Sequence, residues 1–114
     1  MATEHRQIIF GLTALVGVAA TWYWNLQFMA GYGEFSVLAF VADAYANPAA
    51  ASISSDILVV TFAFLFWSLL EARRLGMKHW WVYLLLTFGI AMAFAFPLFL
   101  LMRERRLAAM HIAA

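Results

Sequence analysis

The chain has 114 residues, of which 67% are hydrophobic and only 11% are charged. Charged residues make up about a quarter of a typical soluble domain, so this composition excludes an ordinary soluble protein. A soluble core of this size could not hide so much apolar surface. We therefore expect a single all-α domain over residues 1–114, an integral membrane protein whose partner is the lipid bilayer.

Charge and residue types also exclude several kinds of site. The net charge of +1 gives no electrostatic basis for binding nucleic acid. The chain has no cysteine, and His5, His79 and His111 share no helical spacing. No metal site and no cofactor is therefore expected.

The first apolar segment predicts a membrane-spanning helix near residues 8–27. It ends in bulky Trp22 and Trp24 rather than in the small residues of a signal-peptide cleavage site. We therefore expect a retained span with an interfacial aromatic belt, although a cleaved signal is the alternative. Small residues recur along one face and would let a neighbouring helix approach closely. They are Gly11, Ala14, Gly17 and Ala20.

The next segment predicts a short amphipathic helix over residues 35–46. Gly31 and Gly33 interrupt the preceding helix, and one apolar face then contains Phe35, Leu38 and Val41. A segment of about 12 residues cannot cross a bilayer. We expect it to lie in the membrane interface or to fold over the helix bundle.

Residues 49–75 predict the second span and the longest helix. Asn47 is a good N-cap, and Pro48 suits the first helical position. Gly76 stands where a left-handed residue usually closes a helix. A helix between these signals is about 40 Å long, which exceeds the ~30 Å hydrocarbon core of a bilayer.

Residues 80–102 predict the third span. This segment carries no charge and begins with Trp80 and Trp81, so it is the clearest membrane signal in the sequence. We expect one helix, antiparallel to the second span and kinked at Pro97. The fold class is therefore three transmembrane helices plus a short amphipathic interfacial helix in the first connection.

Charge orients this three-span topology only weakly. The side that holds the N-terminus carries four cations and the opposite side carries three, so the positive-inside rule barely decides. The first connection has no cation, which favours a cytoplasmic N-terminus. The first side holds Arg6, Arg73, Arg74 and Lys78, and the second holds Arg103, Arg105 and Arg106.

Asp56 is the candidate catalytic residue. It shares one helical stripe with Ala63 and Glu71, and a carboxylate near hydrocarbon should face the bundle or a wet cavity. Facing inward, it would accept a hydrogen bond and could act as a proton donor when protonated. The alternative is an interfacial position in water near the helix N-terminus. The expected partners are Asn25, Gln27 and Asn47.

Four residues are candidates for binding: Glu71, Arg74, Asn25 and Asn47. Glu71 and Arg74 are spaced i, i+3 and can pair. With the neighbouring cations they form a charged cluster that could bind a lipid phosphate or a partner subunit. The alternative is that they only fix the end of the helix, as Asn47 caps its start.

Three stretches of the sequence resemble one family of short bacterial membrane proteins. They are NPAAASISSDILVV, LLEARRLGMKHWWVYLLLTF and AFAFPLFLLMRER, within residues 21–106. The family is catalogued as domain of unknown function number twenty-eight thirty-four. The resemblance implies a small integral membrane protein and supplies neither an activity nor functional residues. A fainter likeness, at Asp56, Arg74, Pro97 and Arg103, is to plant membrane proteins needed for neoxanthin formation.

These observations leave two main functions open. The first is a non-enzymatic accessory subunit of the bacterial inner membrane, with multiple spans and a membrane-protein partner or a second copy of itself. The second is a membrane-embedded enzyme acting on an isoprenoid or carotenoid, in which Asp56 exchanges a proton and aromatic rings shelter a carbocation. A proton or ion carrier is a third, weaker possibility.

Overall fold

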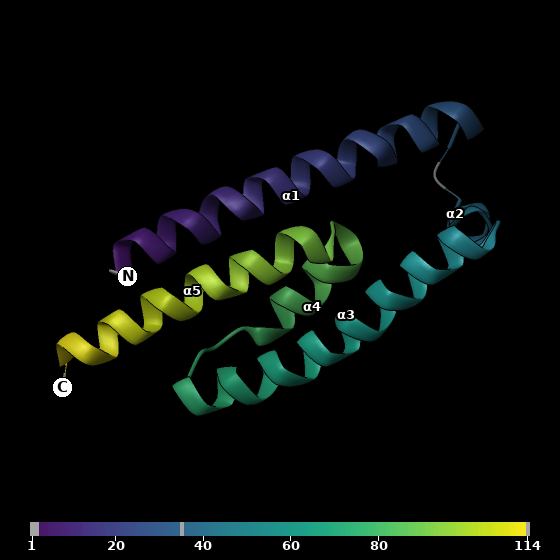
Figure 1. Ribbon diagram of the computed structural model, residues 1–114. Coiled ribbons are helices and arrows are strands. Elements are labelled where there is room, and N and C mark those ends of the chain that lie inside the picture. The colour runs from purple at the N-terminus through teal and green to yellow at the C-terminus, as the bar shows by residue number, and fades with distance from the viewer. Residues whose placement is uncertain (1–2, 35, 114) are drawn as a thin grey trace.

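The computed structural model describes residues 3–34 and 36–113, which form an elongated helical molecule measuring 53 × 24 × 23 Å (Figure 1). The expected all-helical fold is confirmed over these ranges. The helices are α1 (Thr3–Tyr32), α2 (Val37–Ala44), α3 (Pro48–Leu75), α4 (Trp80–Gly89) and α5 (Met92–Ala113).

Helix α1 extends beyond the predicted span of 8–27 at both ends. Gly31 lies inside the helix, which continues to Tyr32. The interruption comes at Gly33, whose φ of +80° is readily adopted only by glycine. At 30 residues, α1 is about 45 Å long.

Helix α2 is the short helix predicted in the first connection, although it covers only Val37–Ala44. Its N-cap is Ser36, whose hydroxyl oxygen accepts the backbone N–H of Ala39 at 3.2 Å. The hydroxyl of Tyr32 donates to Asp43 at 2.8 Å and so connects α2 to the end of α1. Phe35, with which the predicted helix began, lies outside the described residues.

Helix α3 begins and ends at the residues that the sequence indicated. The side-chain oxygen of Asn47 accepts the backbone N–H of Ala50 at 2.8 Å, and Pro48 is the first helical residue. Gly76 closes the helix in the left-handed conformation, with φ of 67°. The predicted cap and the predicted glycine conformation are both confirmed.

The prediction of one helix over residues 80–102 is wrong. The chain forms two helices, and it reverses direction between them at Ile90 and Ala91 (Figure 1). The rings of Tyr83 and Phe99, one from each helix, meet edge to face at 5.1 Å. Ile90 is the C-cap of α4, with φ of −116° and ψ of −71°. Pro97 lies inside α5, and the helix continues through it.

Helix α5 lies between α1 and α3. It runs parallel to α3, since Phe64 stacks on Phe96 and Trp67 meets Phe99 further along both helices. It runs antiparallel to α1 (Figure 1). The buried core is built by α3, α4 and α5 and consists of Phe64, Leu65, Ala72, Tyr83 and Phe99.

The small-residue face of α1 packs against α5, as its spacing suggested. Ala14 is buried, and the backbone at Gly17 lies directly against the carbonyl group of Ala93. Gly11 faces Leu101. The neighbour that this face was expected to admit is therefore within the same chain.

Candidate functional site

A buried carboxylate joins the last turns of α3 to the middle of α5. Glu71 retains only 8% of its side-chain exposure, and its two oxygens accept separate hydrogen bonds. The Nε atoms of Arg74 and Arg103 each lie 2.6 Å from these oxygens. The predicted pair of Glu71 and Arg74 is present, and Arg103 also lies near the ring of Trp67, 5.8 Å from its centroid.

A second buried carboxylate extends this network to α1. Glu104 accepts a hydrogen bond from the Nε atom of Arg6 at 3.0 Å, and Arg103 lies 3.8 Å from its other oxygen. Arg106 donates to the backbone carbonyl of Leu75 at 2.7 Å, which satisfies an acceptor at the end of α3. We call Arg6, Glu71, Arg74, Arg103 and Glu104 the ion-pair cluster. It joins α1, α3 and α5 at one end of the molecule.

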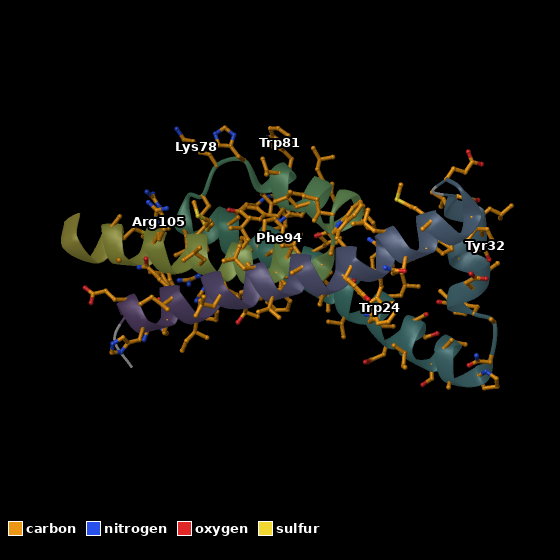
Figure 2. All side chains as sticks on the ribbon, turned by 90° about the horizontal axis from the view of Figure 1, so that it is seen from above. Trp24, Tyr32, Lys78, Trp81, Phe94 and Arg105 are labelled. Atoms are coloured by element: carbon orange, nitrogen blue, oxygen red, sulfur yellow. The ribbon has the colours of Figure 1, made fainter. Side chains whose placement is uncertain are left out.

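All seven lysine and arginine residues of the chain lie at the end that holds the ion-pair cluster. The reversal at Ile90 brings Arg103, Arg105 and Arg106 back to the end where the N-terminus and the α3–α4 connection lie. Figure 2 shows Lys78 and Arg105 at this end and Tyr32 at the opposite one. Three acidic residues share the basic end, and Glu34, Asp43 and Asp56 lie toward the other.

An open groove of about 640 Å³ lies between α1 and α3, with α5 as its floor. It exists because α1 and α3 both pack on α5, which lies between them, and not closely on each other (Figure 1). Asp56 is the charged member of its lining. The walls are Ile9, Phe10, Thr13, Val16 and Gly17 from α1, Asp56, Ile57 and Val60 from α3, and Met92, Ala93, Phe96, Pro97 and Leu100 from α5. We call this the α1–α3 groove.

Asp56 faces α1 and α5 across the α1–α3 groove, which matches its expected direction. The expected hydrogen bond is absent, however. Asp56 is exposed, and within the described part of the chain it makes no hydrogen bond or ion pair. The reason is that α1 and α3 pack on α5 rather than closely on each other, so Asn25 and Gln27 of α1 do not reach Asp56.

The other candidate residues do not join Asp56 in one site. Asn47 is exposed and its side chain caps α3. Asn25 is half-buried on α1, beyond the groove lining. Glu71 and Arg74 belong to the ion-pair cluster, 15 and 18 residues further along α3 than Asp56.

Sequence reasoning missed Arg6 and Glu104 because their pairing depends on the chain reversal. These two residues are 98 positions apart, and no spacing rule connects them. It also missed the contact of Trp22, whose indole N–H donates to the carbonyl oxygen of Ile90 at 2.9 Å. One feature of the sequence could have indicated this pair. Arg6 and Glu104 each border an apolar segment, and a charge in that position needs either a partner or water.

Two helices in the described ranges are long and apolar enough to cross a membrane. They are Glu4–Tyr32 within α1 and Pro48–Leu75, which is α3. Both expose most of their large apolar side chains, as in Leu15, Val16 and Phe62. This surface suits a lipid solvent better than water.

One comparison with known proteins gives a match. A family model described as "Protein of unknown function DUF2834" matches residues 9–105. No curated protein and no solved structure matches the chain. The matched range includes α3, the groove, α1 from residue 9 onward and the ion-pair cluster except Arg6. Because it covers most of the sequence, the chain belongs to the DUF2834 family of proteins of unknown function.

Proposed function

We propose that the chain is a non-enzymatic accessory protein of the bacterial inner membrane. In this proposal α1 and α3 cross the bilayer, and the α4–α5 hairpin enters it from the cytoplasmic side. Both termini and the α3–α4 connection then lie in the cytoplasm. Two crossings and a hairpin replace the three crossings expected from the sequence.

The observation that carries this proposal is the segregation of charge. With all seven cations at one end and none at the other, the positive-inside rule places the basic end in the cytoplasm. The three-span topology divided the same cations almost evenly between the two sides. Their gathering at one end supports the hairpin topology.

The length of the hairpin supports the same topology. Helix α4 has 10 residues and is about 15 Å long, which is half of a ~30 Å hydrocarbon core. A helix that turns at half depth leaves backbone groups without helical partners, and these need protein partners within the membrane. Trp22 supplies one by donating to the carbonyl oxygen of Ile90.

The proposed accessory role is supported by the exposed apolar surface of α2, at the end of the molecule opposite the cations. None of the α2 residues is buried, and Val37 and Leu38 are 68% and 83% exposed. Asp43 keeps this helix beside α1 through Tyr32. An exposed apolar helix beside the bilayer suits a membrane-protein partner or the lipid interface.

The topology is tested by labelling single cysteines, since the chain has none of its own. We expect Lys78→Cys and Ala109→Cys to react with a membrane-impermeant maleimide only after the cells are opened. Glu34→Cys should react in intact spheroplasts. Reaction of Ala109→Cys on the side opposite to Lys78→Cys would restore the three-span topology.

The accessory role is tested by photo-crosslinking in the native host. A photoreactive residue at Leu38 or at Leu15, both exposed, should give one adduct of defined mass with a second polypeptide. The same residue at buried Ala14 is the control and should give none. Lipid adducts alone at both exposed positions would contradict the proposal.

A second candidate function rests on a different observation, the place of Asp56 in the α1–α3 groove. An enzyme acting on an isoprenoid could use this carboxylate to exchange a proton beside an apolar chain. Asp56→Asn would then abolish turnover while the fold persists. An unchanged isoprenoid profile in a host carrying Asp56→Asn would exclude this candidate.

A further inference from the structure

We propose that the α1–α3 groove binds a single-chain amphiphile whose head group, an alcohol or a protonated amine, donates a hydrogen bond to Asp56. This inference does not depend on the accessory role, but the depth assigned to Asp56 rests on the proposed crossing of the bilayer by α3. It concerns binding alone and holds whether or not a reaction follows.

The shape of the groove selects a single apolar chain. Its volume of about 640 Å³ lies within the range of roughly 300–1,000 Å³ found for small-molecule sites. Its floor runs from Met92 to Leu100 of α5, which is about 12 Å. That length suits an extended alkyl chain but only about two turns of a partner helix. The walls are apolar except at Thr13 and Asp56.

The polar groups of the groove select the head group. The hydroxyl of Thr13 donates to the backbone carbonyl of Ile9 at 2.7 Å, so its proton is already used. Asp56 offers carboxylate oxygens and has no partner among the described residues. A donor is therefore complementary to this end of the groove. An anionic head group would meet a like charge with no cation in the lining.

The depth of Asp56 in the membrane strengthens this complementarity. It lies 15 residues before Glu71 on α3, which is about 22 Å along the helix axis. If Glu71 marks the cytoplasmic boundary, Asp56 remains several ångströms inside a ~30 Å hydrocarbon core. A carboxylate at that depth is costly unless it is paired or hydrated. A donor head group would supply the missing partner.

The test is native mass spectrometry of the full chain in a nonionic detergent. Decylamine, decanol and decanoic acid are added in separate titrations at equal concentrations, because the amine and alcohol adducts are nearly equal in mass. We expect one-to-one adducts of the amine and the alcohol and none of the acid. Asp56→Asn should weaken the amine adduct by at least about tenfold while keeping the alcohol, because an amide oxygen still accepts a hydrogen bond.

Two further variants separate the head-group contact from the groove itself. Val16→Trp should fill the groove and remove both adducts although Asp56 is intact. Glu34→Gln removes a carboxylate at the same end of the molecule but outside the groove, and it should bind like the parent chain. Circular dichroism and the melting temperature confirm that each variant is folded, and Val60→Trp replaces Val16→Trp if that variant is not.

Several outcomes would overturn the proposal. Equal binding of the acid and the amine would show that Asp56 does not select the head group. Unchanged adducts in folded Asp56→Asn and Val16→Trp would place the ligand elsewhere. A dimeric mass that excludes all three amphiphiles would show that a second copy of the chain fills the groove.

Discussion

Gly17 of α1 lies against the backbone carbonyl of Ala93 in α5, so closely that a Cβ atom on Gly17 would be 2.0 Å from the carbonyl oxygen. Pro97 stands four residues after Ala93 and has no N–H to donate to that oxygen. The carbonyl left without its helical donor is therefore the one that α1 approaches. Glycine and proline act together here to bring two helix backbones into contact.

We expect Gly17→Ala to lower the free energy of unfolding by about 1–3 kcal/mol, because the atoms in the way are backbone and cannot move aside. Gly11→Ala is the matched control on the same face. Its Cβ would meet the flexible end of Leu101 at 3.8 Å, an ordinary contact. Melting temperatures in one detergent compare the two variants, and an equal effect of both would contradict the role given to Gly17.

This contact shows what the sequence of α1 could and could not reveal. The recurrence of Gly11, Ala14 and Gly17 predicted a face for close helix packing, and it is confirmed. Their spacing carries no information about which helix docks there. The partner is α5, and the match depends on Pro97, 80 residues further along the chain.

The ion-pair cluster gives a second prediction, centred on buried Glu71. Replacing it with Gln removes the nearer counter-charge of Arg103, which is only 24% exposed and keeps Glu104 at 3.8 Å. We expect the free energy of unfolding to fall by about 3–5 kcal/mol, as when one partner of a buried ion pair is removed in other proteins. Arg74 contacts the same carboxylate but is 62% exposed, so water replaces it readily.

Arg74→Gln is therefore the control, and it should melt close to the parent chain. Thermal unfolding of both variants in detergent checks this difference. Equal destabilisation by the two substitutions would mean that the exposed pair matters as much as the buried one. If Glu71→Gln melts at the same temperature as the parent chain, the ion-pair cluster does not stabilise the fold.

The region after Gly76 shows the limit of sequence reasoning. Local signals placed both ends of α3, because a cap at Asn47 and a left-handed Gly76 each act within a few residues. Beside the reversal at Ile90 the local signal is Gly89, and a single glycine is also tolerated inside a helix. Residues 80–102 contain no charge and no proline before Pro97, so their sequence suits one span as well as a hairpin. Pro97 lies seven residues after Ile90 and does not mark the turn.

The candidate site was only partly predictable for the same reason. The helical stripe from Asp56 to Glu71 follows from periodicity, and both residues face α5 or its edges. The groove itself depends on the separation of α1 from α3, which the sequence does not encode locally. The predicted hydrogen-bond partners of Asp56 were wrong, because residues at a similar depth in the membrane can still lie far apart across the helix bundle.

The hairpin turn provides the last prediction, through Trp22. Its indole N–H donates to the carbonyl of Ile90, which lies just beyond the last residue of α4. Trp22→Phe keeps an aromatic ring but removes this donor and leaves the carbonyl without it. We expect the free energy of unfolding to fall by about 1–3 kcal/mol and hydrogen exchange to be faster at the amides of residues 90–95.

Trp24→Phe is the control, because Trp24 is 69% exposed and its replacement should change stability little. Hydrogen exchange followed by mass spectrometry compares the variants. Parent-like protection of residues 90–95 in Trp22→Phe would show that the turn holds without α1.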